Sequence, residues 1–463
     1  MNSAASLIEK STGATDEKIQ KLQDLAKQAA ELIQKHSFVY LFTHNDADGL
    51  TSAAIMIQAL TRARISYQHF VVAKLDNGIV FGFKQNLKKD ALLIFCDIGS
   101  GQSRALEILS ETNPILVLDH HVPSGKSPAK IVVSPMEVGL EGANMISGAG
   151  VTYLTAKAMN PINVDLSTLA VAGMIGDRQL MISANALILQ DAKEGGYLTV
   201  RNGLKVGNGS LFDIFMTTTE PYLDMTGNPE KIKSFLSGFS FSDKTIEELT
   251  DAEMKKLTDA ILSEISAHGS PDAVEAAAGE IYYLKNRLIE NVFDFAGILG
   301  SCGKDEEFDI AVALCFGDAA VLEKAKEIHF KNQEYLIKSL NEAIPQVRSL
   351  DNISYIHGKD LQSAGEISTT YIRYINPEKP FVCLNENDDI IKISARGTRD
   401  LIQKGLDFST AVKTAAEFAG GSGGGHNIAS GGAIPLGTGM FFLKKLDELV
   451  GLQMNRKLIK NSK

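Results

Sequence analysis

Cysteine is scarce in this sequence and long apolar runs are missing. The four cysteines, Cys96, Cys302, Cys315 and Cys383, are scattered over 463 residues without a Cys-x-x-Cys pair. This usage argues against a zinc ribbon or a disulfide scaffold and is typical of the reducing cytoplasm. No apolar stretch is long enough to span a bilayer, and the N-terminus shows no signal-peptide pattern. We therefore expect a cytoplasmic protein without membrane contact, in which Cys96 is a buried structural thiol.

Positive charge is also in short supply, because the formal net charge is -10 at pH 7. Proteins that coat nucleic acid without regard to sequence are usually basic, so this balance argues against that class. A nucleic-acid substrate stays open, since bound metal ions neutralise a clustered carboxylate site. The length exceeds that of one compact domain, so two or three domains are expected.

An alternation of short apolar runs and helical segments fills the chain from residue 38 to about 177. An amphipathic helix over 16–36 precedes it. The expected strands are 38–43, 68–73, 91–96, 115–118 and 130–133, and the expected helices are 49–62, 101–110, 150–159 and 166–175. Such alternation predicts an α/β fold with a mostly parallel sheet that is covered on both faces.

The pattern changes beyond residue 180. Turn signals such as Gly207-Asn208-Gly209 precede a long helical stretch over roughly 243–295. Further on, expected strands lie at 310–315, 353–356, 381–384 and 390–395, with a helix near 410–418. The chain therefore reads as two α/β parts separated by a mainly helical insert.

Acidic side chains occur where the expected strands and one apolar helix end. In chain order the motif residues are Asp46, Asp48, Asp97, Asp119 with His120 and His121, and Asp177. The carboxyl ends of parallel strands meet at one edge of a sheet, so these side chains should converge. Carboxylates and imidazoles are ligands that Mn²⁺ and Mg²⁺ accept in proteins. The sequence therefore predicts a two-metal site.

Each of these motifs also has a plainer interpretation. The pair Asp46 and Asp48 alone would be a helix N-cap, and Asp177 alone a helix end. The recurrence of acids at the same topological position favours the metal site over these separate explanations. His44 is equally compatible with a metal ligand and with a neighbouring polar group.

A glycine run near the C-terminus forms a second candidate site. It ends in Gly423, Gly424, Gly425 and His426. Such runs are usually flexible linkers, but glycine N–H groups also allow close approach to a phosphate, to which His426 could add a hydrogen bond. Arg396, at the end of an expected strand, could bind a phosphate through two nitrogens or form a salt bridge with a surface acid.

Taken together, the motifs closely resemble the DHH phosphoesterase superfamily. The matching segments are His44-Asn45-Asp46-Ala47-Asp48-Gly49, Asp97, Asp119-His120-His121, Gly176-Asp177, and residues 423–431 for the associated domain. The order of these blocks is most similar to the archaeal RecJ-like exonucleases, which include the GINS-associated nuclease. The resemblance implies an N-terminal helix over 1–36, a catalytic domain over 37–240, a helical insert over 241–345 and a substrate-binding domain over 346–463. The catalytic and substrate-binding domains would face each other across a cleft.

The resemblance also implies a role for each motif. One Mn²⁺ would be held by Asp46 and Asp97, with His44 as a further candidate, and Mg²⁺ is the alternative ion. The second metal ion would be held by Asp48, Asp97, His120 and Asp177. Asp119 would orient an imidazole, His121 would face the scissile phosphate, and Arg396 with residues 423–426 would bind the substrate. The implied activity is hydrolysis of single-stranded DNA or RNA to mononucleotides by two-metal activation of water, in DNA replication or repair, with GINS as a candidate partner.

Two alternatives stay open. The protein could act on small substrates, namely oligoribonucleotides or cyclic dinucleotides, within the same enzyme class. It could also be a replisome scaffold, for which missing metal ligands would be expected, yet all the motif residues are present here. The sequence sets neither the polarity of degradation nor the choice between DNA and RNA.

Overall fold

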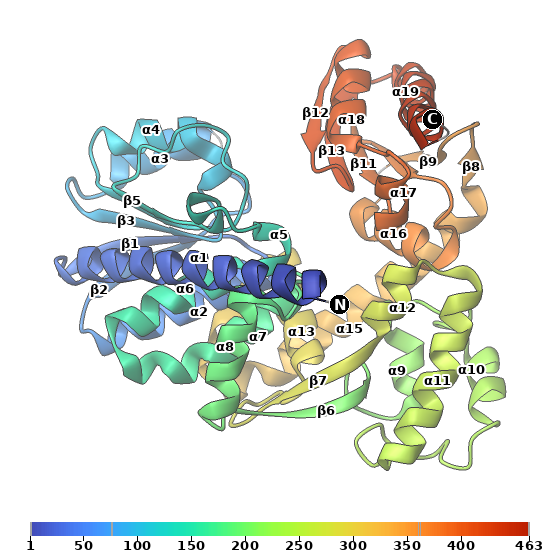
Figure 1. Ribbon diagram of the computed structural model, residues 1–463, viewed down its shortest axis with the longest axis horizontal. Coiled ribbons are helices and arrows are strands. Elements are labelled where there is room, and N and C mark those ends of the chain that lie inside the picture. The colour runs from blue at the N-terminus through green and yellow to red at the C-terminus, as the bar shows by residue number, and fades with distance from the viewer. Residues whose placement is uncertain (1, 76, 360, 362, 462–463) are drawn as a thin grey trace. The chain divides into compact units, whose positions relative to one another are not determined.

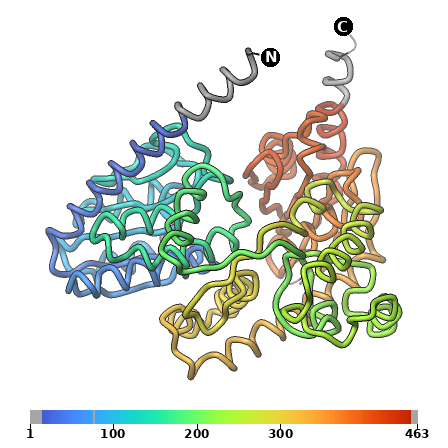
Figure 2. The backbone as a smooth tube through the Cα atoms, turned by 60° about the horizontal axis from the view of Figure 1, so that its bottom comes forward, coloured from blue at the N-terminus to red at the C-terminus, as the bar shows by residue number. Residues whose placement is uncertain are grey.

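The computed structural model describes residues 2–461 except 76, 360 and 362, with side chains described only within 15–454, residue 77 excepted. Contacts divide the chain into two units: residues 1–201 with 281–329, and residues 202–280 with 330–463. The chain therefore leaves the first unit, returns to it and leaves again. The two crossings run side by side, because β6 (Leu198–Leu204) pairs with β7 (Ala278–Leu284) (Figure 2). The domain limits suggested by the sequence stay predictions.

The first unit is built around a five-stranded sheet with the order β2-β1-β3-β4-β5. Its strands are β1 (Phe38–Thr43), β2 (Ser66–Val71), β3 (Leu92–Cys96), β4 (Ile115–Leu118) and β5 (Ile131–Val133). Neighbouring strands are parallel throughout. The expected parallel α/β sheet is confirmed, with β2 starting two residues earlier than the sequence suggested.

Helices cover both faces of this sheet (Figure 1). They are α1 (Asn2–Gln34), α2 (Ala47–Arg62), α3 (Asn77–Asn86), α4 (Ser103–Ser110), α5 (Gly142–Met145), α6 (Gly148–Met159), α7 (Ser167–Gly176) and α8 (Ser183–Glu194). Strand residues such as Leu41 and Ile94 pack with α1, α2, α6 and α7. Their neighbours Phe42 and Phe95 face α3 and α4. Both sets alternate along the strands, as the two-residue period of a strand requires.

The N-terminal amphipathic helix is confirmed and is longer than expected. Leu22, Ala26, Ala29 and Ile33 of α1 are buried, and the helix packs against α6 and β5. No helix in the described part of the chain is long and apolar enough to cross a membrane. Cys96 is buried, as expected, and so are the other three cysteines.

Residues 281–329 add two further helices to the first unit, α13 (Val292–Lys304) and α14 (Phe308–Phe316). The expected strand 310–315 is wrong, because this run lies inside α14. The buried positions Ala311, Leu314 and Cys315 have the three- and four-residue spacing of a helix, and a short apolar run alone does not distinguish a strand from a buried helix. The expected helical stretch 243–295 is also wrong as a continuous element, since β7 interrupts it.

The second unit contains a six-stranded mixed sheet with the order β12-β13-β11-β10-β9-β8. Its strands are β8 (Arg348–Ser349), β9 (Ser354–Lys359), β10 (Phe381–Glu386), β11 (Ile390–Arg396), β12 (Ser422–Gly425) and β13 (Ala429–Pro435). The helices are α9 (Leu211–Thr217), α10 (Pro229–Leu236), α11 (Asp251–His268), α12 (Pro271–Ala277), α16 (Ala364–Thr370), α17 (Arg399–Gln403), α18 (Phe408–Phe418) and α19 (Gly439–Asn461), while α15 (Leu322–Ala343) begins in the first unit. The three strands and the helix expected after residue 350 are confirmed, and the glycine run is an edge strand rather than a linker.

Candidate metal centre

The carboxyl edge of the parallel sheet gathers the acidic motifs in one place. Thr43 lies beside Cys96, and Cys96 lies beside Leu118, so β1, β3 and β4 end level with one another. The motif residues follow these ends. Three overlapping groups have ligand atoms within 4.8 Å of one another: His44, Asp46 and Asp97; Asp48, His120 and Asp177; and Asp97, Asp119, His120 and His121. The structure thus brings together all the residues that the sequence suggested for the centre.

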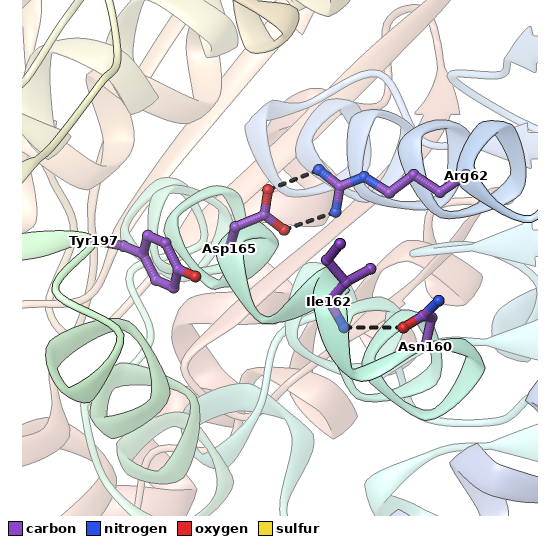
Figure 3. A pocket seen from close by; sticks show the side chains of 5 residues that line it. All are labelled: Arg62, Asn160, Ile162, Asp165 and Tyr197. Atoms are coloured by element: carbon purple, nitrogen blue, oxygen red, sulfur yellow. Dashed lines mark hydrogen bonds and ion pairs between the residues drawn. The ribbon is translucent and has the colours of Figure 1, made fainter.

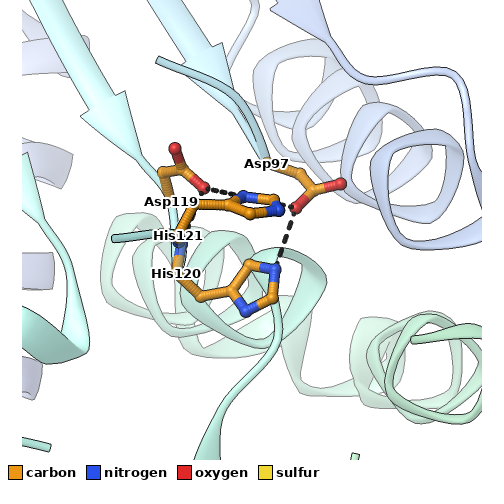
Figure 4. A group of neighbouring side chains, drawn as sticks. All are labelled: Asp97, Asp119, His120 and His121. Atoms are coloured by element: carbon orange, nitrogen blue, oxygen red, sulfur yellow. Dashed lines mark hydrogen bonds and ion pairs between the residues drawn. The ribbon is translucent and has the colours of Figure 1, made fainter. Parts of the chain in front are cut away.

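Asp97 lies in the middle of this arrangement. It takes a left-handed backbone conformation, with φ of 58°, which an aspartate tolerates better than most residues. Its side chain is 1% exposed, and neither carboxylate oxygen has a hydrogen-bond partner. The nearest imidazole nitrogen, Nε2 of His120, is 3.3 Å from Oδ1 (Figure 4). Burial and the charge of Asp48 raise the pKa of Asp97 well above its ordinary value.

Asp46 and Asp48 occupy different environments although only one residue separates them. Oδ2 of Asp46 lies 2.8 Å from Nδ1 of His44. Burial alone would raise the pKa of Asp46, but this imidazole lowers it to about 2. Asp48 is buried and accepts the N–H groups of Gly148 and Ala149, at 2.7 and 3.0 Å. Burial and the charge of Asp177 nevertheless raise the pKa of Asp48 to about 6.

Asp119 forms a hydrogen bond with the side chain of His121. Its buried carboxylate accepts the backbone N–H groups of Ser100 and His120, both at 2.8 Å. It also accepts Nδ1–H of His121 at 2.8 Å, as Figure 4 shows. Burial would raise the pKa of Asp119, but the hydrogen bond and charge of His121 lower it well below its ordinary value. These bonds fix the orientation of the His121 ring, as the sequence suggested.

His120 presents its other nitrogen to the acids. Nδ1 lies 2.9 Å from the backbone oxygen of Gly142, so this nitrogen carries the proton. Nε2 faces the acids and lies 3.7 Å from Asp177 and 3.8 Å from Asp48. Burial would lower the pKa of His120, but the charges of these two acids raise it. A histidine held in this way is prepared to ligate a metal through Nε2.

The donor set suits a divalent cation. Clustered carboxylates with raised pKa values are costly as anions unless a cation lies among them. The two oxygens of Asp97 without partners supply the direct observation, because buried polar atoms are rarely left unsatisfied. Oxygen and imidazole donors are those that Mn²⁺ and Mg²⁺ accept. The residues present therefore fit a metal centre.

Gln179 is a residue of the site that the sequence motifs do not single out. Its side chain is buried, and Nε2 donates to the Gly142 carbonyl at 2.8 Å and to Oδ2 of Asp177 at 2.9 Å. Its place two residues after Asp177 is the one available signal. No spacing could show that it also reaches a carbonyl 37 residues away.

The residues suggested for substrate binding lie in the second unit, at one end of its sheet. Arg396 ends β11 and is paired with Ala429 of β13. The N–H of His426 donates to the carbonyl of the same Ala429 at 2.8 Å. Gly423, Gly424 and Gly425 form most of the edge strand β12, and His426 is exposed beside it. The structure thus places Arg396 and His426 on either side of one residue.

A pocket of about 600 Å³ lies elsewhere in the first unit (Figure 3). It is lined by Arg62, Asn160, Ile162, Asp165 and Tyr197. Arg62 donates to both carboxylate oxygens of Asp165, each at 2.7 Å. No residue of the candidate metal centre lines this pocket, so it is a separate feature.

Comparison with known proteins identifies the family. The DHH family N-terminal domain matches residues 38–174, and the DHHA1 domain matches residues 353–452. A relative, MJ0831 of Methanocaldococcus jannaschii, is 30% identical over 450 residues, which are 95% of this chain and 100% of that protein. The chain belongs to the DHH family. This DHH protein is therefore expected to carry the phosphoester-hydrolysing chemistry of its family.

Its fold is also that of RecJ. The single-stranded-DNA-specific exonuclease RecJ of Thermus thermophilus is 26% identical over 165 residues, covering 34% of this chain and 25% of that protein. The crystal structure of Thermus thermophilus RecJ with Mn²⁺ aligns with a TM-score of 0.60 at 16% identity, covering 93% of this chain and 54% of RecJ. The structure of CDC45 from Entamoeba histolytica aligns with a TM-score of 0.63 at 14% identity, covering 95% of this chain and 99% of CDC45. These structural likenesses establish the fold of the DHH protein, which spans about half the length of that RecJ.

Proposed function

We propose that this DHH protein is a metal-dependent phosphodiesterase that degrades single-stranded nucleic acid from an end to mononucleotides. The observation that carries the proposal is Asp97, a buried carboxylate without a hydrogen-bond partner, surrounded by acids and imidazoles. Bound cations would neutralise the buried negative charge of this cluster. We expect two Mn²⁺ ions, with Mg²⁺ as the alternative. Asp46, Asp97 and His44 would hold one. The second would be held by Asp48, Asp97, His120 and Asp177.

The histidine pair and Asp119 define what the chain itself contributes. When bound, two divalent ions would lower the pKa of a coordinated water and stabilise charge on the phosphoryl group. His121 is oriented by Asp119 through Nδ1, which leaves its Nε2 to donate to the phosphate or to the departing oxygen. Burial would lower the pKa of His121, but the hydrogen bond and charge of Asp119 raise it, which favours the doubly protonated ring. His121 is therefore our candidate for the general acid.

The sheet of the second unit is our candidate for binding the polymer. Arg396 has the planar guanidinium that suits a phosphate, and in the structure its Nη1 donates to the carbonyl of Ala395 at 2.9 Å. At the glycines of β12 no side chain separates the backbone N–H groups from a ligand. The exposed side chain of His426 adds a further donor. We expect this end of the sheet to hold backbone phosphates of the single strand. The glycines act through the backbone, so Arg396 and His426 are the positions to mutate.

The RecJ likeness supports the choice of a polymer substrate. The RecJ proteins it matches are named single-stranded-DNA-specific exonucleases. A role in DNA replication or repair and an association with GINS are further parts of this proposal. Both follow from the family resemblance of the motifs rather than from a contact within the chain.

Product analysis tests the proposal. Single strands of DNA and RNA with matched sequence, labelled at either end, are incubated with the protein and Mn²⁺, and the products are separated by length. Asp119→Ala is the inactive control, because it removes the group that orients His121. We expect mononucleotides to be released stepwise from one end, and this release to be absent in the control.

Two results would contradict the proposal. Intact strands after prolonged incubation would exclude an exonuclease and redirect the search to oligoribonucleotides and cyclic dinucleotides. Equal cleavage by the control variant would show that another site is responsible. The same gels give the polarity and the preference for DNA or RNA.

A further inference from the structure

One backbone segment touches several residues of the metal centre. It begins at Gly142 and ends at Ala149, and we call it the 142–149 segment. Its first carbonyl accepts Nδ1–H of His120 at 2.9 Å. At its other end, the N–H groups of Gly148 and Ala149 donate to the two carboxylate oxygens of Asp48.

The same segment also passes directly against Asp97. A Cβ atom added to Gly148 would lie 2.5 Å from the Cβ and Oδ1 atoms of Asp97. The position of the segment therefore sets where the ligand atoms of three residues lie. Anything that fixes the segment therefore also restrains these three side chains.

Gln179 fixes the segment to a fourth ligand. Its buried Nε2 group has two protons, and both are used: one on the Gly142 carbonyl and one on Oδ2 of Asp177. The Gly142 carbonyl is the same one that accepts the proton of His120. A single amide thus connects the side chain of Asp177 with the partner of His120.

The orientation of this amide is itself determined. Both atoms facing Nε2 are oxygens that accept hydrogen bonds, so the nitrogen must point to them. On the opposite side, Nδ2 of the fully buried Asn185 donates to Oε1 of Gln179 at 3.1 Å. Asn185 also donates to the carbonyls of Leu180 and Asn144, at 2.9 and 3.4 Å. Asn144 lies within the 142–149 segment, so Asn185 holds both the amide and the segment.

We propose that Gln179, supported by Asn185, is a positioning residue for one of the two metal ions. It is the ion that the group of Asp48, His120 and Asp177 would hold. Gln179 bonds directly to Asp177 and, through one carbonyl, to the partner of His120. Among the described residues it makes no hydrogen bond with His44 or Asp46, so the ion on that side should be little affected. The proposal rests on the metal centre of the proposed function.

Metal titration without substrate tests this proposal. The full chain is titrated with Mn²⁺, following heat by calorimetry and free Mn²⁺ by electron paramagnetic resonance. Gln179→Met keeps nearly the same volume but removes both donors. We expect two ions in the wild type, and in Gln179→Met one ion bound roughly 10–100-fold more weakly, as is typical when the support of a ligand is removed. The matched control is Gln190→Met on the exposed face of α8, where the amide donates to the carboxylate of Glu194.

A second variant covers the case in which Gln179→Met does not fold. Asn185→Ala leaves the donors of Gln179 in place but frees its Oε1, so we expect it to weaken the same ion by a smaller factor. Unfolding temperatures measured in EDTA compare the folding of all variants. The Mn²⁺ affinities of whichever variant folds then decide whether Gln179 positions the metal ligands.

Several outcomes would overturn the proposal. Unchanged binding of both ions in Gln179→Met would do so, and equal weakening of both ions would show a general structural role. Wild-type protein that binds fewer than two ions would also overturn it. Because no nucleic acid is present in the titration, a failure to degrade single strands would contradict the proposed function without affecting this result.

Discussion

Replacing Asp97 by asparagine should stabilise the metal-free protein and remove its stabilisation by Mn²⁺. The carboxylate is buried, and neither of its oxygens accepts a hydrogen bond. Its charge is repelled by Asp48 and Asp46. The substitution therefore removes an unfavourable buried charge without breaking a hydrogen bond. It also removes the carboxylate that would bind both metal ions.

Asp48 shows how the charge of a buried carboxylate in this cluster affects stability. Its pKa is raised from 3.8 to about 6, which corresponds to a cost of about 3 kcal/mol when the group is ionised. The unfolded chain loses this proton near pH 3.8 and the folded chain near pH 6. The cost is therefore absent below pH 3.8, grows between the two values and is complete above them. Asp97 is destabilised by the same causes, burial and neighbouring carboxylates, so Asp97→Asn at pH 8 should raise both the free energy of unfolding and the unfolding temperature.

Thermal unfolding at pH 8, with EDTA and then with Mn²⁺, measures both effects. At Mn²⁺ concentrations 100 times the dissociation constant, a single bound ion adds about 2.7 kcal/mol to the wild type. Asp97→Asn should show no such increase. Asp389→Asn, at an exposed acid of the second unit, is the control. A lower unfolding temperature for Asp97→Asn in EDTA, or an equal Mn²⁺ effect in both proteins, would contradict this role of Asp97.

Three further changes test other parts of the first unit. Asp119→Asn should lower the turnover rate on the order of 10²–10⁴-fold, because His121 loses its orientation, while the Mn²⁺ affinity from calorimetry changes little; an unaltered rate would count against the assigned role. In Gly303→Ala the new Cβ would lie 1.8 Å from the carbonyl oxygen of Asn45, which should displace the neighbouring metal ligands and weaken Mn²⁺ binding; wild-type affinity would show that the loop adapts. Burial lowers the pKa of His329 to about 4 from 6.5, so the unfolded chain takes the proton first and the protein should lose up to about 3 kcal/mol as the pH falls through this range. Urea unfolding at pH 7 and pH 5 should show a smaller difference for His329→Gln than for the wild type, and equal differences would reject this assignment.

The metal centre was largely predictable because its signals are local. Thr43, Cys96 and Leu118 each end a short apolar run, and parallel strands bring such ends to one edge. The helix over 308–316 was not predictable in the same way. Its apolar run fits a strand and a buried helix equally well, and only its packing decides between them.

The supports of the ligands could not be predicted either. The bond between Gln179 and the carbonyl of Gly142 joins residues far apart in the sequence. The same is true of Gly303, whose closeness to Asn45 depends on the return of the chain after residue 280. Local patterns show which side chains carry chemistry. The tertiary fold determines which neighbours hold them in place.

Anomalous X-ray scattering at the manganese edge, from crystals grown with Mn²⁺, would locate the metal ions in the first unit. We expect two peaks, both in contact with the carboxylate of Asp97. One should also contact the group of His44 and Asp46, and the other the group of Asp48, His120 and Asp177. A map without peaks at the carboxyl edge of the first sheet, or with peaks that do not contact Asp97, would contradict the account.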